Sequence, residues 1–243
     1  MRTHRGLDSS MLIPDLGREG RRHTTVDSHH GGRIPALDRC VAEEAAVTIR
    51  CYSGPNLPEM LMTPTVARLM WEWRAVYQPA LAAVGAELSP RRRAVLSPAA
   101  PPRVVFVVGE ETLTRFEAGN PDPDTAAEQL RSLRDDAGER HVSVLVHPLA
   151  APALPWAACR FTVTTGADGR HTAFVETPGP SGLLIVRDPE HVEVYLAIFA
   201  ALRGDSLSED ASLVRIADTL PPHHQAAAAP GDGSDAPTTI ARP

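Results

Sequence analysis

Three short β-rich segments lie close together in the second half of the chain, and they constrain its fold more than any other feature. They are residues 160–165, 172–177 and 183–187, and only turn-length connections containing glycine separate them. Connections this short favour antiparallel pairing, because a parallel crossover needs a dozen or more residues. The pattern therefore predicts an antiparallel meander in this part of the chain.

Two further β-rich segments precede the meander. Residues 103–108 and 142–147 are largely apolar, which predicts buried strands. Between them we expect a short helix over 110–116. A longer helix should follow, because Thr125 and Glu128 have the spacing of a capping box. This part of the chain thus alternates between strand and helix.

Helical periodicity marks the remaining segments. A first helix is predicted over 36–50, where apolar residues recur at helical spacing. A second begins at Pro64, with Thr63 as its N-cap. Two closing helices begin at Pro189 and after Ser208, so helices stand at both ends of the folded region.

The helix that begins at Pro64 carries an apolar stripe on one face. Stripes of this kind belong to a hydrophobic core far more often than to a cofactor site. We therefore predict that the stripe is part of the core. Its members are Val66, Leu69, Met70, Trp73 and Tyr77.

The order of these segments predicts a single α+β domain over residues 35–220. Its parts are N-terminal helices, a central strand–helix unit, the antiparallel meander and two closing helices. Residues 1–34 and 221–243 lack periodicity and are rich in small and polar residues. We predict that both are disordered tails.

Composition excludes several kinds of chemistry. All 24 basic residues are arginine, so the chain cannot use a Schiff-base lysine or a phosphate-loop lysine. Its three cysteines, Cys40, Cys51 and Cys159, fit no metal or redox spacing. The two His-His pairs lie in the predicted tails and lack the helical spacing of a zinc pair. We expect no metal and no cofactor.

We expect neither a membrane span nor a secretory signal in this chain. Its apolar runs are much shorter than the roughly 18 residues that a membrane helix needs, and no apolar core follows the N-terminal arginines. We therefore expect a cytoplasmic protein.

The distribution of charge argues against a surface that binds DNA. Residues 40–220 contain 16 arginines and 23 acidic residues, whereas residues 1–39 contain 7 arginines and 5 acidic residues. A folded domain of net charge -7 is poorly suited to the phosphate backbone. Direct binding of DNA by the domain is not expected.

An ordered set of short motifs between about residues 43 and 220 resembles a known family. This is the actinobacterial domain of unknown function that forms the C-terminal part of Xre-type helix-turn-helix transcriptional regulators, which are WhiJ-like and antitoxin-like. The motifs are residues 57–63, 66–68, 91–93, 107–113 around Glu110, 129–133, 144–148, Phe161, 174–176 with Glu176, and Tyr195, Phe199 and Leu202 with 207–208 and Ser212.

The sequence departs from the family pattern in two places. About 40 residues precede the resemblance, without helical periodicity, where the family regulators carry a helix-turn-helix domain. We therefore expect the DNA-reading half to be missing. In the segment 57–63, Glu59 replaces a family glycine and Met62 replaces a glutamine. We expect the contacts of this loop to have changed.

Two glutamates are candidate site residues. Glu110 and Glu176 each lie at or near the end of a predicted strand and match family positions. Two carboxylates could share a proton, hold an amine or perform acid–base catalysis. Alternatively, each caps a helix or pairs with an arginine. His147 also follows a strand and could act as a base, although a surface role is the commoner one.

Further candidates surround the meander. Arg160 and Arg187 bracket it and are possible partners of the glutamates, and Phe161 matches a family phenylalanine. Trp71, Trp73 and Trp156 are candidates for the wall of a ligand pocket, and Trp156 is the one most expected to lie in a loop over a site. We predict a ligand site formed by Glu110, Trp156, Arg160, Phe161 and Glu176. Residues 91–93, a run of three arginines, could clamp an anion but are expected to be a solvated linker.

Two functions follow from these observations. The first is a regulatory or ligand-sensing module that acts through a small molecule or a protein partner, as the resemblance implies. The second is an enzyme of a specialised-metabolite pathway, with Glu110 and Glu176 as acid–base or amine-positioning groups and His147 assisting. A homodimer and DNA binding through a partner subunit are also compatible with the sequence.

Overall fold

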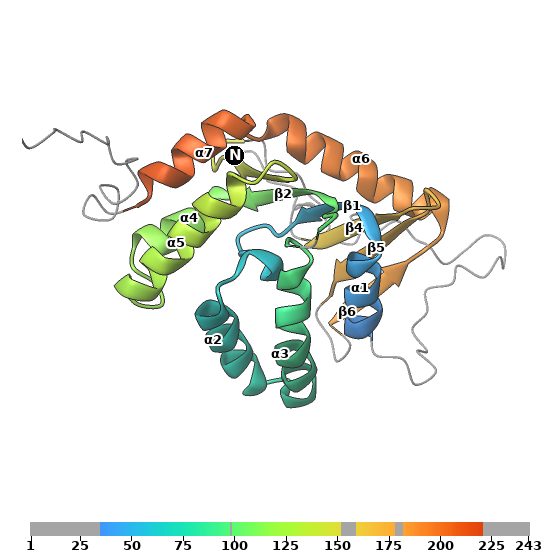
Figure 1. The fold of residues 1–243 in the computed structure, drawn as a ribbon, viewed down its shortest axis with the longest axis horizontal. Helices are drawn as coiled ribbons and strands as arrows, with labels where there is room; N and C mark the ends of the chain where they lie inside the picture. Colours follow the sequence, from blue (N-terminus) through green and yellow to red (C-terminus); the bar gives the residue numbers. More distant parts are fainter. Residues whose placement is uncertain (1–34, 98, 152–158, 178–181, 221–243) are drawn as a thin grey trace, which may run out of the picture.

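Figure 1 shows a computed structural model of the chain, which describes residues 35–97, 99–151, 159–177 and 182–220. The predicted tails 1–34 and 221–243 and the candidate Trp156 lie outside these residues. The α+β architecture is confirmed. The elements are α1 (Pro35–Glu44), β1 (Ala46–Tyr52), the 3-10 turn η2 (Glu59–Leu61), α2 (Pro64–Ala75), α3 (Pro79–Ala94), β2 (Arg103–Gly109), α4 (Glu110–Glu117), α5 (Pro123–Ala137), β3 (Val142–His147), β4 (Phe161–Gly166), β5 (His171–Glu176), β6 (Leu183–Val186), α6 (Pro189–Asp205) and α7 (Glu209–Asp218).

The strands form one mixed sheet in the order β3-β2-β1-β4-β5-β6. Strands β1, β2 and β3 are parallel to one another, whereas β4, β5 and β6 pair in antiparallel orientation. The predicted meander is therefore confirmed. Strand β1 joins the two halves, because Cys51 is opposite Phe106 on its parallel side and Thr162 on its antiparallel side.

The helix predicted over 36–50 is wrong in its second half. Helix α1 ends at Glu44, and β1 begins at Ala46. The apolar residues that suggested a helix include Ile49, which instead faces the core between two neighbouring strands. Tertiary pairing on both sides overrides the local pattern, and the β-branched residues of the segment suit a strand.

Helix α3 occupies the stretch where a linker was expected. It contains Pro90, and residues 91–93 form its last turn. The expectation of a solvated linker is therefore wrong: Arg92 is buried, and Arg93 pairs with Asp136 on α5 at 2.6 Å. Basic residues in a last turn also suit the negative end of the helix dipole.

Sequence signals located most helix starts. Thr63, Asp188 and Ser208 each accept a hydrogen bond from a backbone N–H in the first turn that follows. The predicted capping box is wrong, because Asp122 is the N-cap of α5 and accepts from the Thr125 N–H at 3.0 Å.

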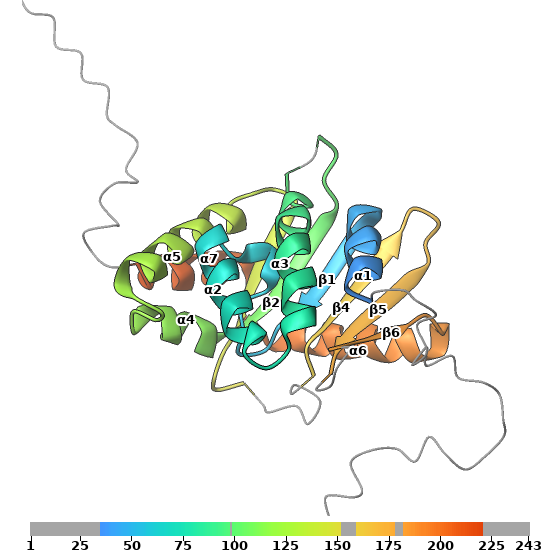
Figure 2. The same ribbon diagram turned by 90° about the horizontal axis from the view of Figure 1, so that it is seen from below.

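Helices cover both faces of the sheet (Figures 1 and 2). Helix α6 packs on one face, where Val192, Phe199 and Leu202 contact side chains of β1 to β5. The other face carries α1, α3 and α5, while α7 contacts α5 and β3 at the β3 edge. Among the described helices, none is long and apolar enough to cross a membrane.

Candidate functional site

A cleft of about 820 Å³ opens at one end of the sheet. Its walls come from the carboxyl ends of β1 and β5, the start of β4, the loop after β1, and helices α2 and α4. Ligand sites in open sheets with parallel strands favour the carboxyl ends of the strands where the chain changes direction across the sheet. Here that point lies between β1 and β4.

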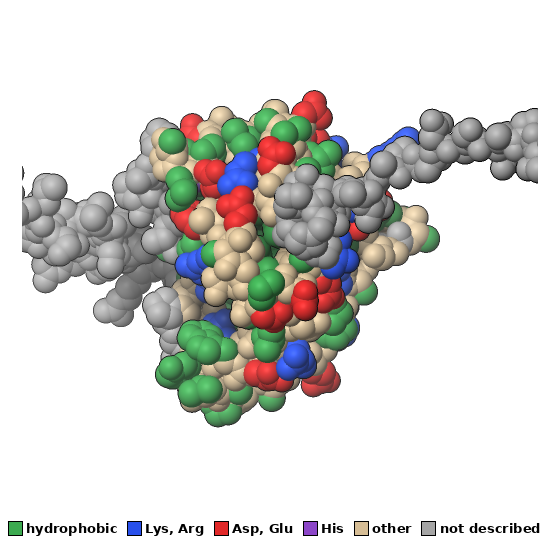
Figure 3. All heavy atoms as spheres, turned by 90° about the vertical axis from the view of Figure 1, so that its left-hand side faces the viewer, with side chains coloured by type: hydrophobic (Ala, Val, Ile, Leu, Met, Phe, Trp, Pro, Cys, Tyr) green, Lys and Arg blue, Asp and Glu red, His purple; other side chains and the backbone are tan. Residues whose placement is uncertain are grey.

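The apolar stripe of α2 lies in this cleft. All five of its members line the cavity, and Trp73 and Tyr77 are 67% and 71% exposed. The prediction that the stripe belongs to the core is therefore wrong for Trp73 and Tyr77, whereas Val66 and Met70 line the cleft and also pack against the core. Figure 3 shows apolar side chains gathered over the end of α2, with the surface hollowed beside them.

Packing of α2 on α3 explains why the stripe faces outward. Ala67 and Trp71 are the buried residues of α2, and the ring of Trp71 fills the space beside Gly85 on α3. Because Trp71, one of the two tryptophans of the helix, is used in this contact, the neighbouring stripe turns toward the cleft.

The cleft contains two buried hydroxyls that have no hydrogen-bond partner among the described residues. They belong to Ser53 and Thr112, which are 5% and 2% exposed. Ser53 follows β1, and Thr112 lies in the first turn of α4. A buried polar group left unpaired costs about 1–3 kcal/mol. Both residues line the cleft, so a polar group of a ligand that reaches these oxygens would give them a partner.

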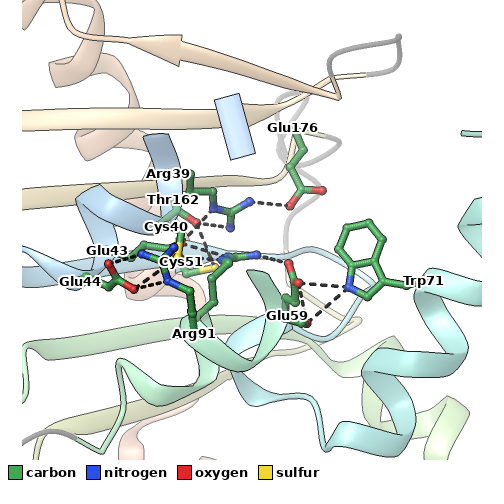
Figure 4. A network of polar contacts seen from close by, with 12 residues as sticks. Arg39, Cys40, Glu43, Glu44, Cys51, Glu59, Trp71, Arg91, Thr162 and Glu176 are labelled. Carbon is green, nitrogen blue, oxygen red and sulfur yellow. Dashed lines mark hydrogen bonds and ion pairs between the residues drawn. The ribbon is translucent and has the colours of Figure 1, made fainter. Parts of the chain in front are cut away.

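A buried ion network lies beside the cleft (Figure 4). Glu43 is fully buried and accepts from Arg39 at 2.9 Å and from Arg92 at 2.7 Å. Burial alone would raise the pKa of Glu43, but Arg92 and Arg39 outweigh it and hold the pKa below its usual value. The network thus keeps a charged carboxylate in the interior.

Glu59 extends the network to the α2–α3 hairpin. It pairs with Arg92 and accepts hydrogen bonds from Ser89 Oγ at 2.7 Å and Trp71 Nε1 at 3.2 Å. The sequence had marked this position, where glutamate replaces a family glycine. Glycine has no side chain and could make none of these contacts. The contacts of this loop therefore differ from those that a glycine here would allow.

Glu176 and Arg160 form the partly exposed end of the network, where it lines the cleft. Glu176 pairs with Arg160 at 2.7 Å and with Arg39 at 3.3 Å, and Arg39 also donates to Thr162 Oγ1 at 2.9 Å. Burial would raise the pKa of Glu176, but Arg39 and Arg160 hold it below its usual value. Its carboxylate is therefore charged and doubly paired.

Three predicted ligand-binding residues come together in the cleft: Arg160, Phe161 and Glu176. Glu110 does not line it. Its carboxylate accepts from Arg215 Nε at 3.0 Å and from the Leu149 N–H at 3.1 Å. The two candidate glutamates are thus held by different arginines in different places.

His147 ends β3 opposite Gly109 and does not line the cleft. Its Nδ1 is buried and has no hydrogen-bond partner in the part of the chain that the structure describes. Arg187, the other predicted partner of a glutamate, pairs with Asp38 at 3.6 Å instead.

Sequence reasoning missed several residues of the cleft, namely Arg39, Ser53, Arg74, Thr112 and Arg115. Thr112 lies within the motif 107–113 but was not singled out, and no motif includes the other four, because each faces the cleft only through the packing of its element.

Metal and thiol chemistry find little support in the described residues. Within them, no group of three or more His, Cys, Asp or Glu side chains could hold a metal ion. Cys40 and Cys51 are buried, and burial raises the pKa of the Cys40 thiol to about 11. A thiol held in this state is a poor nucleophile.

Comparison with known proteins identifies the family of the chain. The sequence profile of a domain of unknown function, DUF5753, matches residues 38–218. The chain belongs to this family. The DUF5753 match spans the elements from α1 to α7, so the cleft and the ion network both lie within the family domain. No curated protein and no solved structure matches the chain significantly.

Proposed function

We propose that this DUF5753 chain is a ligand-sensing regulatory module that binds a small molecule in the cleft. The observation that carries the proposal is the apolar stripe that begins on α2, because all of its members line an open cavity and Trp73 and Tyr77 are largely exposed there. A volume of about 820 Å³ lies within the usual range for small-molecule sites.

Energetics support a ligand in this place. Burial of apolar surface contributes roughly 25 cal/mol of free energy per Å². Trp73 and Tyr77 are both largely exposed, so they lack this contribution. A ligand between α2 and α4 would cover these rings. It would also offer partners to the hydroxyls of Ser53 and Thr112.

The regulatory part of the proposal rests on the resemblance to the effector half of antitoxin-like regulators. The make-up of the cleft walls supports a regulatory role. The walls belong to separate elements: Met70 is on α2, Phe116 on α4 and Phe161 on β4. A ligand that contacts all three would restrict their relative movement, and a protein partner that contacts α2 or α4 could detect this restriction.

The enzyme hypothesis requires Glu110 and Glu176 to act on one reacting group. Their separate ion pairs with Arg215 and with Arg39 and Arg160 do not favour this arrangement. The sensing module is the function that the geometry supports best.

Nile red, a neutral apolar dye that fluoresces in apolar sites, tests the proposal. We expect it to bind the wild-type chain. The double variant Trp73→Ala/Tyr77→Ala should bind it at least about tenfold more weakly, because two exposed aromatic walls are lost. Both side chains are exposed, so the fold should survive, as circular dichroism can verify.

The matched control is Val194→Ala/Val214→Ala, which removes two exposed apolar side chains outside the cleft. It should bind the dye as the wild type does. Equal dye binding by both double variants and the wild type, or no binding by any, would contradict the proposal.

A further inference from the structure

We propose that the ligand of the cleft is an organic anion, a carboxylate on a flat apolar body, and that Arg115 is its main anchor. This inference rests on the proposed function, because it concerns the same cleft. It depends on three observations: the balance of charge around the cavity, the face of α4 that lines it, and the rings opposite.

The buried ion network contributes no net charge. It contains the guanidinium groups of Arg39, Arg92 and Arg160. Against these stand three carboxylates, those of Glu43, Glu59 and Glu176. The six groups pair with one another, so they leave no charge for a ligand to neutralise.

Two cations of the lining have no carboxylate partner in the part of the chain that the structure describes. Arg74 donates to Gln78 Oε1 at 3.2 Å and lies 5.6 Å from the centre of the Trp71 ring. The guanidinium of Arg115 makes no hydrogen bond or ion pair with any described residue. The cleft is thus positive within a domain whose residues 40–220 carry -7, which favours an anion.

Helix α4 presents these groups in a suitable order. Thr112, Arg115 and Phe116 all line the cleft and have the i, i+3, i+4 spacing of one helix face. Thr112 lies in the first turn, where the helix dipole favours negative charge. A carboxylate along this face would accept a hydrogen bond from the Thr112 hydroxyl and two from the guanidinium of Arg115. Ser53 supplies a further donor beside it.

The opposite wall suits flat rings. Trp73 and Tyr77 meet edge to face, with ring centres 5.5 Å apart and planes at 60°. Phe116 and Phe161 also line the cleft. Aromatic groups on several sides of one cavity favour a planar apolar body that can stack or meet them edge-on.

Three naphthalene probes of equal size test the ligand class: 2-naphthoate, neutral 2-naphthamide and cationic 2-naphthylmethylamine. Isothermal titration calorimetry on the full chain measures their Kd values. We expect naphthoate to bind about tenfold more tightly than naphthamide, as hydrogen bonds to a charged group exceed those to a neutral one. The amine should bind most weakly.

Two arginine variants test whether Arg115 binds the carboxylate of the ligand. Arg115→Gln should weaken naphthoate binding to the level of naphthamide and leave naphthamide binding unchanged. Arg131→Gln, which changes an exposed arginine on α5 outside the cleft, is the control and should leave both affinities unchanged. Naphthoate should also displace Nile red from the wild-type chain.

Several results would contradict the proposal that the cleft binds an organic anion. Equal affinity for the three probes, an unchanged naphthoate affinity in Arg115→Gln, or an equal loss in Arg131→Gln would overturn the anion class. Failure of all three probes while Nile red still binds would overturn it as well. In each of these cases the Nile red result, which uses a neutral dye, decides separately whether the cleft binds ligands at all.

Discussion

At the scale of single residues, Glu43 is the centre of the interior charge network. It is fully buried and bonded to both Arg39 and Arg92. Removing one partner of a buried ion pair leaves an uncompensated charge in the interior, which costs much more than loss of an exposed pair. The stability of the α1–α3 contact therefore depends on this carboxylate.

We predict that Glu43→Gln lowers the free energy of unfolding by about 3 kcal/mol, as measured by urea denaturation. The control is Glu72→Gln, which removes an ion pair with Arg68 whose two side chains are each 58% exposed. Exposed pairs contribute about 0–1 kcal/mol. Similar losses in the two variants would show that burial does not decide the strength of the Glu43 pairs.

At the scale of secondary-structure elements, the α2–α3 hairpin depends on the contact between Trp71 and Gly85. A Cβ atom on Gly85 would lie much closer to the Trp71 ring than van der Waals contact allows. The ring is also held by its hydrogen bonds to Glu59 and Ser89, so it cannot move away without breaking them.

We therefore predict that Gly85→Ala destabilises the chain by about 2 kcal/mol through overpacking, although alanine is the better helix former. Gly204→Ala is the matched control, because Gly204 lies in α6 and a Cβ atom added there would meet no atom within 4 Å. It should be neutral or stabilising by up to about 1 kcal/mol. Thermal unfolding of both variants gives the comparison, and a stabilising Gly85→Ala would refute the tight packing of the hairpin.

At the scale of the whole molecule, an ion cluster ties the middle of the chain to its closing helix. Arg215 on α7 pairs with Glu110 at 3.0 Å and with Glu117 at 2.7 Å, both on α4. The Leu149 N–H and Arg215 hold the pKa of Glu110 below its ordinary value of 4.5. A carboxyl whose pKa is lowered by folding stabilises the fold above its unfolded pKa.

The expected pH dependence follows from this direction. The contribution of Glu110 is complete above about pH 4.5 and is lost as the pH falls through its lower folded pKa. Glu110→Gln should therefore be less stable than the wild type at pH 7, and the difference should narrow toward pH 3 in urea denaturation. A difference that stays constant over this range would contradict the assignment.

Much of the fold could be predicted from local signals. The N-caps Thr63, Asp188 and Ser208 and the short connections of the meander act within a few residues, so the sequence alone determined the starts of α2, α6 and α7 and the antiparallel pairing of β4, β5 and β6. The resemblance found from its motifs agrees with the DUF5753 match.

Only the tertiary structure decided the rest. The segment of β1 is a strand because β2 and β4 pair with it on both sides, and the α2 stripe faces the cleft because Trp71 occupies the contact with α3. Likewise, Glu110 and Glu176 looked like a pair in sequence, but separate arginines hold them. In each case the deciding partner lies far along the chain, where neither periodicity nor a local motif carries information about it.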